Sequence, residues 1–89
     1  MNSRPDERRK EERRPASGEV EFVLSDPLAV RFRGTLIDSS NSGFRVAHDC
    51  PALRAGHLVR YWHAMGSGEA RVMWTRTAAA AMEAGFLVL

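Results

Sequence analysis

Apolar and polar side chains alternate along most of the chain with a period of two, which is typical of β-strands buried on one face. The first clear example is Val20, Phe22 and Leu24, which alternate with Glu19 and Glu21. Turn-forming residues separate such segments at intervals of roughly ten residues, a spacing typical of an all-β barrel or sandwich. The pattern predicts six short strands, over residues 20–24, 30–37, 44–48, 58–63, 70–74 and 82–89. Gly66-Ser67-Gly68 is expected to form a hairpin turn between the fourth and fifth strands, and Val72 and Trp74 are expected to share an apolar face.

Length and composition indicate one small globular domain. The chain has 89 residues, of which 44% are hydrophobic and 27% are charged. No apolar run is long enough to cross a membrane, so we expect no membrane span. The single cysteine, Cys50, excludes an internal disulfide and favours a cytoplasmic location.

The net charge is confined to the N-terminal end. Residues 1–15 contain six basic and four acidic residues, a net charge of +2 that equals the charge of the whole chain. This segment has almost no apolar side chains, so we expect a flexible basic arm over residues 1–15 and a barrel domain over residues 16–89. The barrel itself carries no net charge, which argues against nucleic acid as a partner.

Two short motifs in the sequence have complementary chemistry. Arg9 and Arg13 form an R-x-x-x-R pattern in the arm, while Asp38, Ser40 and Gly43 form D-x-S-x-x-G between two predicted strands. An arginine can donate two hydrogen bonds to phosphate oxygens or to O6 and N7 of guanine. A carboxylate can accept from the N–H groups of guanine, and a serine hydroxyl can serve either role. In this order the motifs indicate a guanine nucleotide, although either alone is explained by a solvated tail or a capped turn.

The paired motifs on a six-strand β domain resemble the PilZ family, whose members are bacterial receptors for the second messenger cyclic di-GMP. The resemblance covers residues 8–89 and implies a six-stranded antiparallel β-barrel of the split-barrel type. It implies that Arg9 and Arg13 grip guanine and phosphate, and that Asp38 and Ser40 contact a guanine. Gly43 would let the chain turn closely beneath the ligand.

The resemblance also suggests a role for other residues of the motifs. In the family, an arginine immediately before the first motif tends to accompany an intercalated dimer of the ligand, and Arg8 has this position. Glu11 and Glu12 lie inside the arginine motif and oppose an anionic ligand unless they point to solvent. Further candidates for ligand contact are Arg14, in an alternative register of the motif, together with Ser39 and Trp74.

Other function classes find less support. The histidines and Cys50 have no spacing of a structural zinc site, and no pattern pairs an acid with a base, so we expect neither a metal, a cofactor nor an enzyme. The sequence thus predicts a cyclic di-GMP receptor that signals by ordering its arm, which creates a surface for a protein partner. The alternatives are a PilZ-like interaction module that lacks the ligand and a small barrel that binds nucleic acid.

Overall fold

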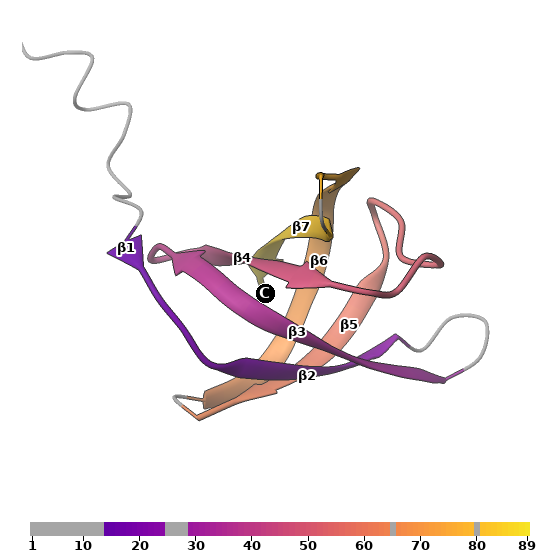
Figure 1. Ribbon diagram of the computed structural model, residues 1–89. Helices are drawn as coiled ribbons and strands as arrows, with labels where there is room; N and C mark the ends of the chain where they lie inside the picture. Colours follow the sequence, from indigo (N-terminus) through magenta and orange to yellow (C-terminus); the bar gives the residue numbers. More distant parts are fainter. Residues whose placement is uncertain (1–13, 25–28, 65, 80) are drawn as a thin grey trace, which may run out of the picture.

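All regular structure in the part of the chain that the computed structural model describes, residues 14–24, 29–64, 66–79 and 81–89, is β-strand (Figure 1). The strands are β1 (Arg14–Pro15), β2 (Glu19–Leu24), β3 (Val30–Ser39), β4 (Gly43–His48), β5 (Leu58–His63), β6 (Gly66–Thr77) and β7 (Met82–Val88). No helix capable of crossing a membrane is found in these ranges.

Six of the strands close into an antiparallel barrel, as the sequence predicts. The order is β3-β2-β5-β6-β7-β4, and β4 pairs back onto β3 to complete the closure. Closure gives each of the six strands a hydrogen-bonded neighbour on both sides, so the barrel has no unpaired edge strand. The β5–β6 connection is shorter than the sequence suggests: His63 pairs with Gly66, so Gly66 and Gly68 belong to β6 and the turn lies before them.

The seventh strand, β1, lies against β3 and is not predicted from the sequence. Arg14 pairs with Ser39, whereas Glu19 of β2 pairs with Thr35 of the same strand. The β1–β2 segment therefore holds one extra residue, a β-bulge near Gly18, which has a φ of 111°. The arm thus reaches the barrel by continuing β2 along β3.

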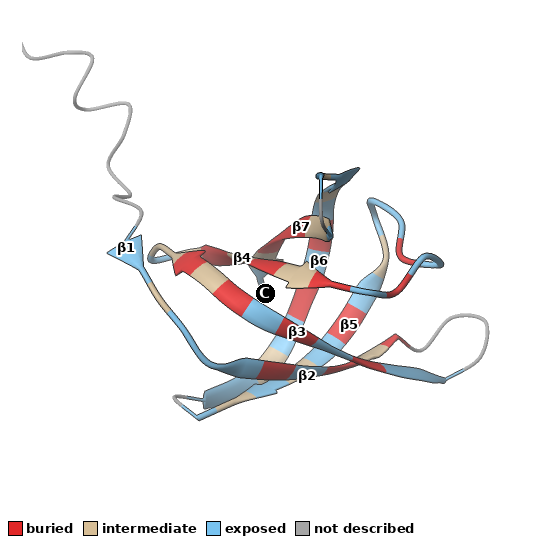
Figure 2. Cartoon of the chain, viewed as in Figure 1, coloured by how far each residue is buried: buried red, intermediate tan, exposed pale blue. Residues whose placement is uncertain are grey.

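The core is formed by the inward positions of the alternating strands (Figure 2). Its centre is a stack of phenylalanines in which the ring of Phe22 lies 4.8 Å from that of Phe32 and 4.8 Å from that of Phe86. Aromatic residues bury large areas and pack well in offset stacks, so this cluster supplies much of the hydrophobic stabilisation.

Two bulges change which side chains face outward. The pairing of β3 with β4 shifts between Leu36 and Asp38, and that of β6 with β7 shifts between Val72 and Trp74. Each extra residue reverses the alternation that follows it. Leu36 and Val72 face the core, whereas Asp38 and Trp74, two positions later, face outward with Arg45 and Gly85. On this outer face Asp38 is still buried by its neighbours, and Trp74 is half-buried. The predicted shared face of Val72 and Trp74 is therefore wrong, because the bulge at Met73 separates them.

His48, at the end of β4, is a buried histidine whose environment favours the neutral ring. Its Nδ1 accepts a hydrogen bond of 3.0 Å from the backbone N–H of Cys50, and its Nε2 is buried without a partner among the described residues. Burial lowers the pKa of His48 from 6.5, and the nearby Asp49 carboxylate only partly opposes this shift. A proton on Nδ1 would also break the bond to Cys50.

We expect His48 to make the fold less stable in mild acid. Because the folded pKa is lowered, the unfolded chain takes up a proton first as the pH falls below 6.5, so the free energy of unfolding decreases until the folded pKa is reached. The slope is at most about 1.4 kcal/mol per pH unit. In His48→Asn, the side-chain oxygen still accepts from the N–H two residues on but does not titrate. Urea unfolding at pH 5.5 and 7.5 should show a smaller loss for this variant; equal losses would contradict the assignment.

Candidate ligand-binding site

The D-x-S-x-x-G motif lies where β3 ends and β4 begins, beside the described end of the arm. Asp38 and Ser39 are the last two residues of β3, and Ser40 opens the loop to β4. In β1, Arg14 pairs with Ser39 and Pro15 pairs with Asp38. The structure therefore brings Arg14 together with this motif. Arg8, Arg9 and Arg13 lie outside the described residues.

Asp38 forms an ion pair with Arg45, the residue opposite it on β4. The Arg45 Nη2 donates to the Asp38 Oδ2 over 2.6 Å. Only 12% of the Asp38 side chain is exposed, compared with 34% for Arg45. The Nε–H of Arg45 is buried and has no hydrogen-bond partner in the described part of the chain. A short charge-assisted bond of this kind holds both groups in a defined orientation on the outer face.

The ion pair belongs to a continuous row of outward positions that crosses five strands. The register pairs Pro15 with Asp38, Asp38 with Arg45, Arg45 with Gly85, and Gly85 with Trp74. Residues directly opposite one another in antiparallel strands have neighbouring side chains on the same face. The row thus brings Trp74 of β6 onto the same surface as Asp38 of β3, although they are far apart in the sequence.

Gly85 makes room for the ring of Trp74. A Cβ atom at Gly85 would overlap the indole, most severely at Nε1, so the ring lies across β7 at this point. On β6, the guanidinium of Arg76 lies 5.6 Å from the centre of the Trp74 ring and is also paired with Glu83 at 2.8 Å. The row therefore ends in a half-buried aromatic ring with a cation beside it.

Gly43 is required by packing against β7. A Cβ atom at Gly43 would overlap the carbonyl oxygen of Phe86. Gly43 is not among the described glycines of positive φ, so this contact, and not backbone conformation, is what favours glycine here. The loop is held in place by two backbone hydrogen bonds, from Ser40 N to Gly43 O (2.8 Å) and from Val88 N to Ser42 O (2.7 Å). The close approach of β7 fixes the loop that carries the motif.

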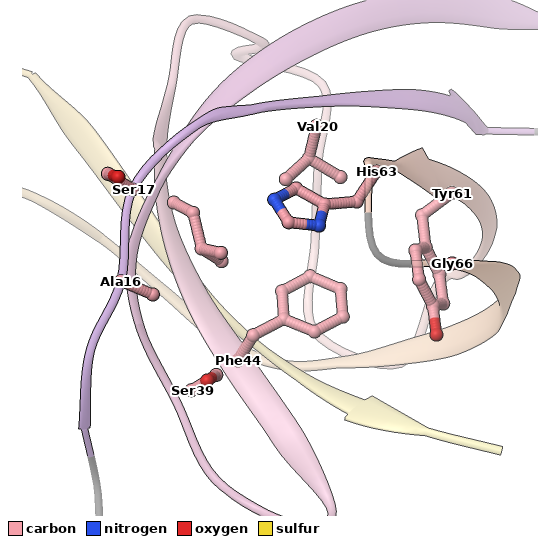
Figure 3. A pocket seen from close by; sticks show the side chains of 9 residues that line it. Ala16, Ser17, Val20, Ser39, Phe44, Tyr61, His63 and Gly66 are labelled. Atoms are coloured by element: carbon pink, nitrogen blue, oxygen red, sulfur yellow. The ribbon is translucent and has the colours of Figure 1, made fainter.

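On the opposite side of β3, the mouth of the barrel contains a mostly apolar pocket of about 330 Å³ (Figure 3). Phe44, Tyr61 and His63 project into it, and Ser17 and Ser39 lie at its edge. Ser39 faces this pocket, whereas Asp38 faces the outer row, because adjacent residues in a strand point to opposite sides. Ser39 is therefore separated from the Asp38 carboxylate by the strand.

The outer row offers a carboxylate acceptor, a guanidinium donor and an aromatic plane, a combination suited to a planar heterocycle with donors and acceptors on one edge. The sequence alone predicts no ligand contact for either Arg45 or Gly85. Only the pairing register of the strands could have identified these two residues. Two bulges change this register, so a period-two pattern does not predict it. Among the described residues, no group of three or more histidine, cysteine or acidic side chains is arranged to hold a metal ion.

Comparison of the chain with models of known protein families and with the sequences of curated proteins finds no match.

Proposed function

We propose that this protein is a PilZ-like receptor that binds cyclic di-GMP on the outer face of its barrel, in the bacterial cytoplasm, and performs no chemistry on it. One observation carries the proposal: Asp38, Arg45 and Trp74 lie in one row, at the point where the arginine-rich arm joins the barrel. A guanine base needs an acceptor for its N–H groups, a donor for its O6 and a surface on which to stack.

Each residue of the two motifs then has a defined task. Arg9 and Arg13 grip the phosphates and the O6 and N7 atoms of a guanine, since guanidinium groups bind both in a bidentate manner. Asp38 accepts from the base, and Ser40 bonds a donor or a phosphate oxygen. Trp74 offers the stacking surface. The support for this arrangement is that Pro15, where the arm meets the barrel, pairs with Asp38 of the outer row.

Signalling would follow from ordering of the arm. The anionic ligand neutralises the cluster of arginines and holds the arm across the outer row, which creates a new surface for a protein partner. Arg8 favours two intercalated ligand molecules for each chain, as the family resemblance implies. The access of a base to Asp38 requires a small displacement of its neighbours, because so little of this side chain is exposed.

A second candidate function is an interaction module that keeps the fold and binds no nucleotide. Two observations favour it. The Asp38 carboxylate already has a cationic partner in Arg45, and Gly43 is required by the packing of β7. Both motif residues would thus be retained for stability alone.

Nuclear magnetic resonance of the ¹⁵N-labelled protein separates these functions. On addition of cyclic di-GMP, we expect the amides of residues 38–45 and the indole N–H of Trp74 to shift, while those near Leu58 and Arg60 stay unchanged. If no signal shifts even at a high concentration of cyclic di-GMP, the interaction module without a ligand is favoured. Salt-sensitive shifts caused equally by a single-stranded oligonucleotide would favour a nucleic-acid-binding barrel instead.

A further inference from the structure

The ion pair between Asp38 and Arg45 places a hydrogen-bond acceptor directly beside a donor. The two groups come from facing positions of β3 and β4, and their contact is 2.6 Å long. The rigid barrel, not a loop, supports both residues, since Asp38 precedes the end of β3 and Arg45 lies within β4. Such an arrangement is well suited to reading the edge of a base, because it costs little reorganisation on binding.

The order of these groups matches guanine. Along one edge of guanine, the O6 acceptor is followed by the N1–H and N2–H donors. A guanidinium that donates to O6 next to a carboxylate that accepts from N1–H and N2–H satisfies all three. Adenine presents the reverse order, with an N6–H donor beside the N1 acceptor. It would place a donor against Arg45 and an acceptor against Asp38, so both contacts would be repulsive.

We propose, on the basis of the proposed cyclic di-GMP binding, that Arg45 contacts the guanine base directly and that the Asp38–Arg45 pair determines guanine specificity. In the free protein Arg45 donates to Asp38. The Arg45 side chain is 34% exposed. In the complex its guanidinium donates to O6 and keeps its contact with Asp38. Arg45 therefore reads the base, whereas the arginines of the arm also serve the phosphates that all cyclic dinucleotides share.

The test is the ratio of the affinities for cyclic di-GMP and cyclic di-AMP, measured by calorimetry on the full chain. For the wild type we expect a ratio of about 100, because a well-placed set of base contacts discriminates by about 1–3 kcal/mol, or about 5- to 150-fold. In Arg45→Met this ratio should fall at least about tenfold, mainly through weaker binding of cyclic di-GMP. Arg60→Met removes an exposed arginine on β5 that is paired with Glu69, and it should leave the ratio unchanged.

If Arg45 had only a structural or general electrostatic role, Arg45→Met would weaken the binding of both ligands equally. An unchanged affinity ratio in this variant therefore overturns the inference, while the proposed function stands. A wild type that binds neither dinucleotide removes the proposed function itself. A second measurement needs no variant: cyclic di-IMP keeps O6 and N1–H but lacks the N2 amine. The wild type should bind it more tightly than cyclic di-AMP, and equal affinities for the two would also overturn the inference.

Discussion

Replacing Gly43 with alanine is expected to destabilise the barrel by about 3 kcal/mol or more. The new methyl group would overlap the backbone oxygen of Phe86, which belongs to β7 and is itself held in two strand pairings. Backbone atoms in a closed barrel have no free direction in which to move, so β4 and β7 must separate locally. In a domain of this size, such a loss lowers the melting temperature by more than about 12 °C.

Gly56→Ala is the matched control for this variant. Gly56 has a φ of 95°, but nothing lies within 4 Å of the position of its Cβ. Alanine there adds only the strain of a left-handed backbone, about 1–2 kcal/mol. Thermal unfolding followed by circular dichroism measures both variants. If Gly43→Ala proved no less stable than Gly56→Ala, the packing explanation for the motif glycine would be wrong.

Removal of either arginine of the first motif is expected to remove about half or more of the stabilisation by cyclic di-GMP. A ligand at 100 times its Kd stabilises a protein by about 2.7 kcal/mol, which corresponds to about 10 °C or more for a small domain. A charge-assisted hydrogen bond contributes about 1.5–3 kcal/mol, so Arg9→Ala or Arg13→Ala should weaken binding by about 10- to 100-fold. At the same ligand concentration, a variant that binds 100-fold more weakly would be stabilised by only about 0.4 kcal/mol.

Arg14→Ala and Arg60→Ala complete this series of thermal shifts. Arg60 lies on β5, away from the outer row, and its replacement should leave the shift intact. Arg14 tests the register of the motif, because it follows Arg13 and pairs with Ser39, the last residue of β3. If only Arg14→Ala lost the thermal shift, the ligand-binding arginine of the motif would be Arg14 in place of Arg13. Equal shifts in all four variants would contradict a role for the arm.

The barrel follows from the sequence because its six strands alternate regularly. The phase of Val20, Phe22 and Leu24 is confirmed by their burial in the core, and the closed six-strand arrangement agrees with the predicted turns. β1 escapes prediction for a physical reason. Arg14 and Pro15 have no apolar pattern, and they are held by backbone pairing with β3 rather than by burial.

The composition of the outer row is where a sequence pattern is least informative. A single inserted residue turns every later side chain to the other face, and the extra residues Ile37 and Met73 are ordinary strand formers that do not announce a bulge. Alternation therefore assigned Trp74 to the core, and it gave no reason to pair Asp38 with Arg45. The motif residues themselves were found from their chemistry, and whether they bind a nucleotide remains a prediction.

Whether the protein is a receptor or a module without a ligand depends on the chemistry of the arm. Glu11 and Glu12 lie between the two arginines of its motif. For a receptor, these carboxylates must point away from the phosphates, because like charges in contact oppose binding. A variant with both replaced by glutamine should bind cyclic di-GMP no more than a few-fold more tightly. An increase of 100-fold or more would show that the carboxylates face the ligand.

Isothermal titration of the full chain with cyclic di-GMP, in parallel with Arg13→Ala, tests the central claim most directly. We predict a saturable isotherm for the wild type, with two ligands per chain if Arg8 acts as the family resemblance implies, and binding that is about 10- to 100-fold weaker for Arg13→Ala. Equal binding by the two proteins, or no binding by the wild type, would contradict the proposal that the outer row and the arm together form a cyclic di-GMP site.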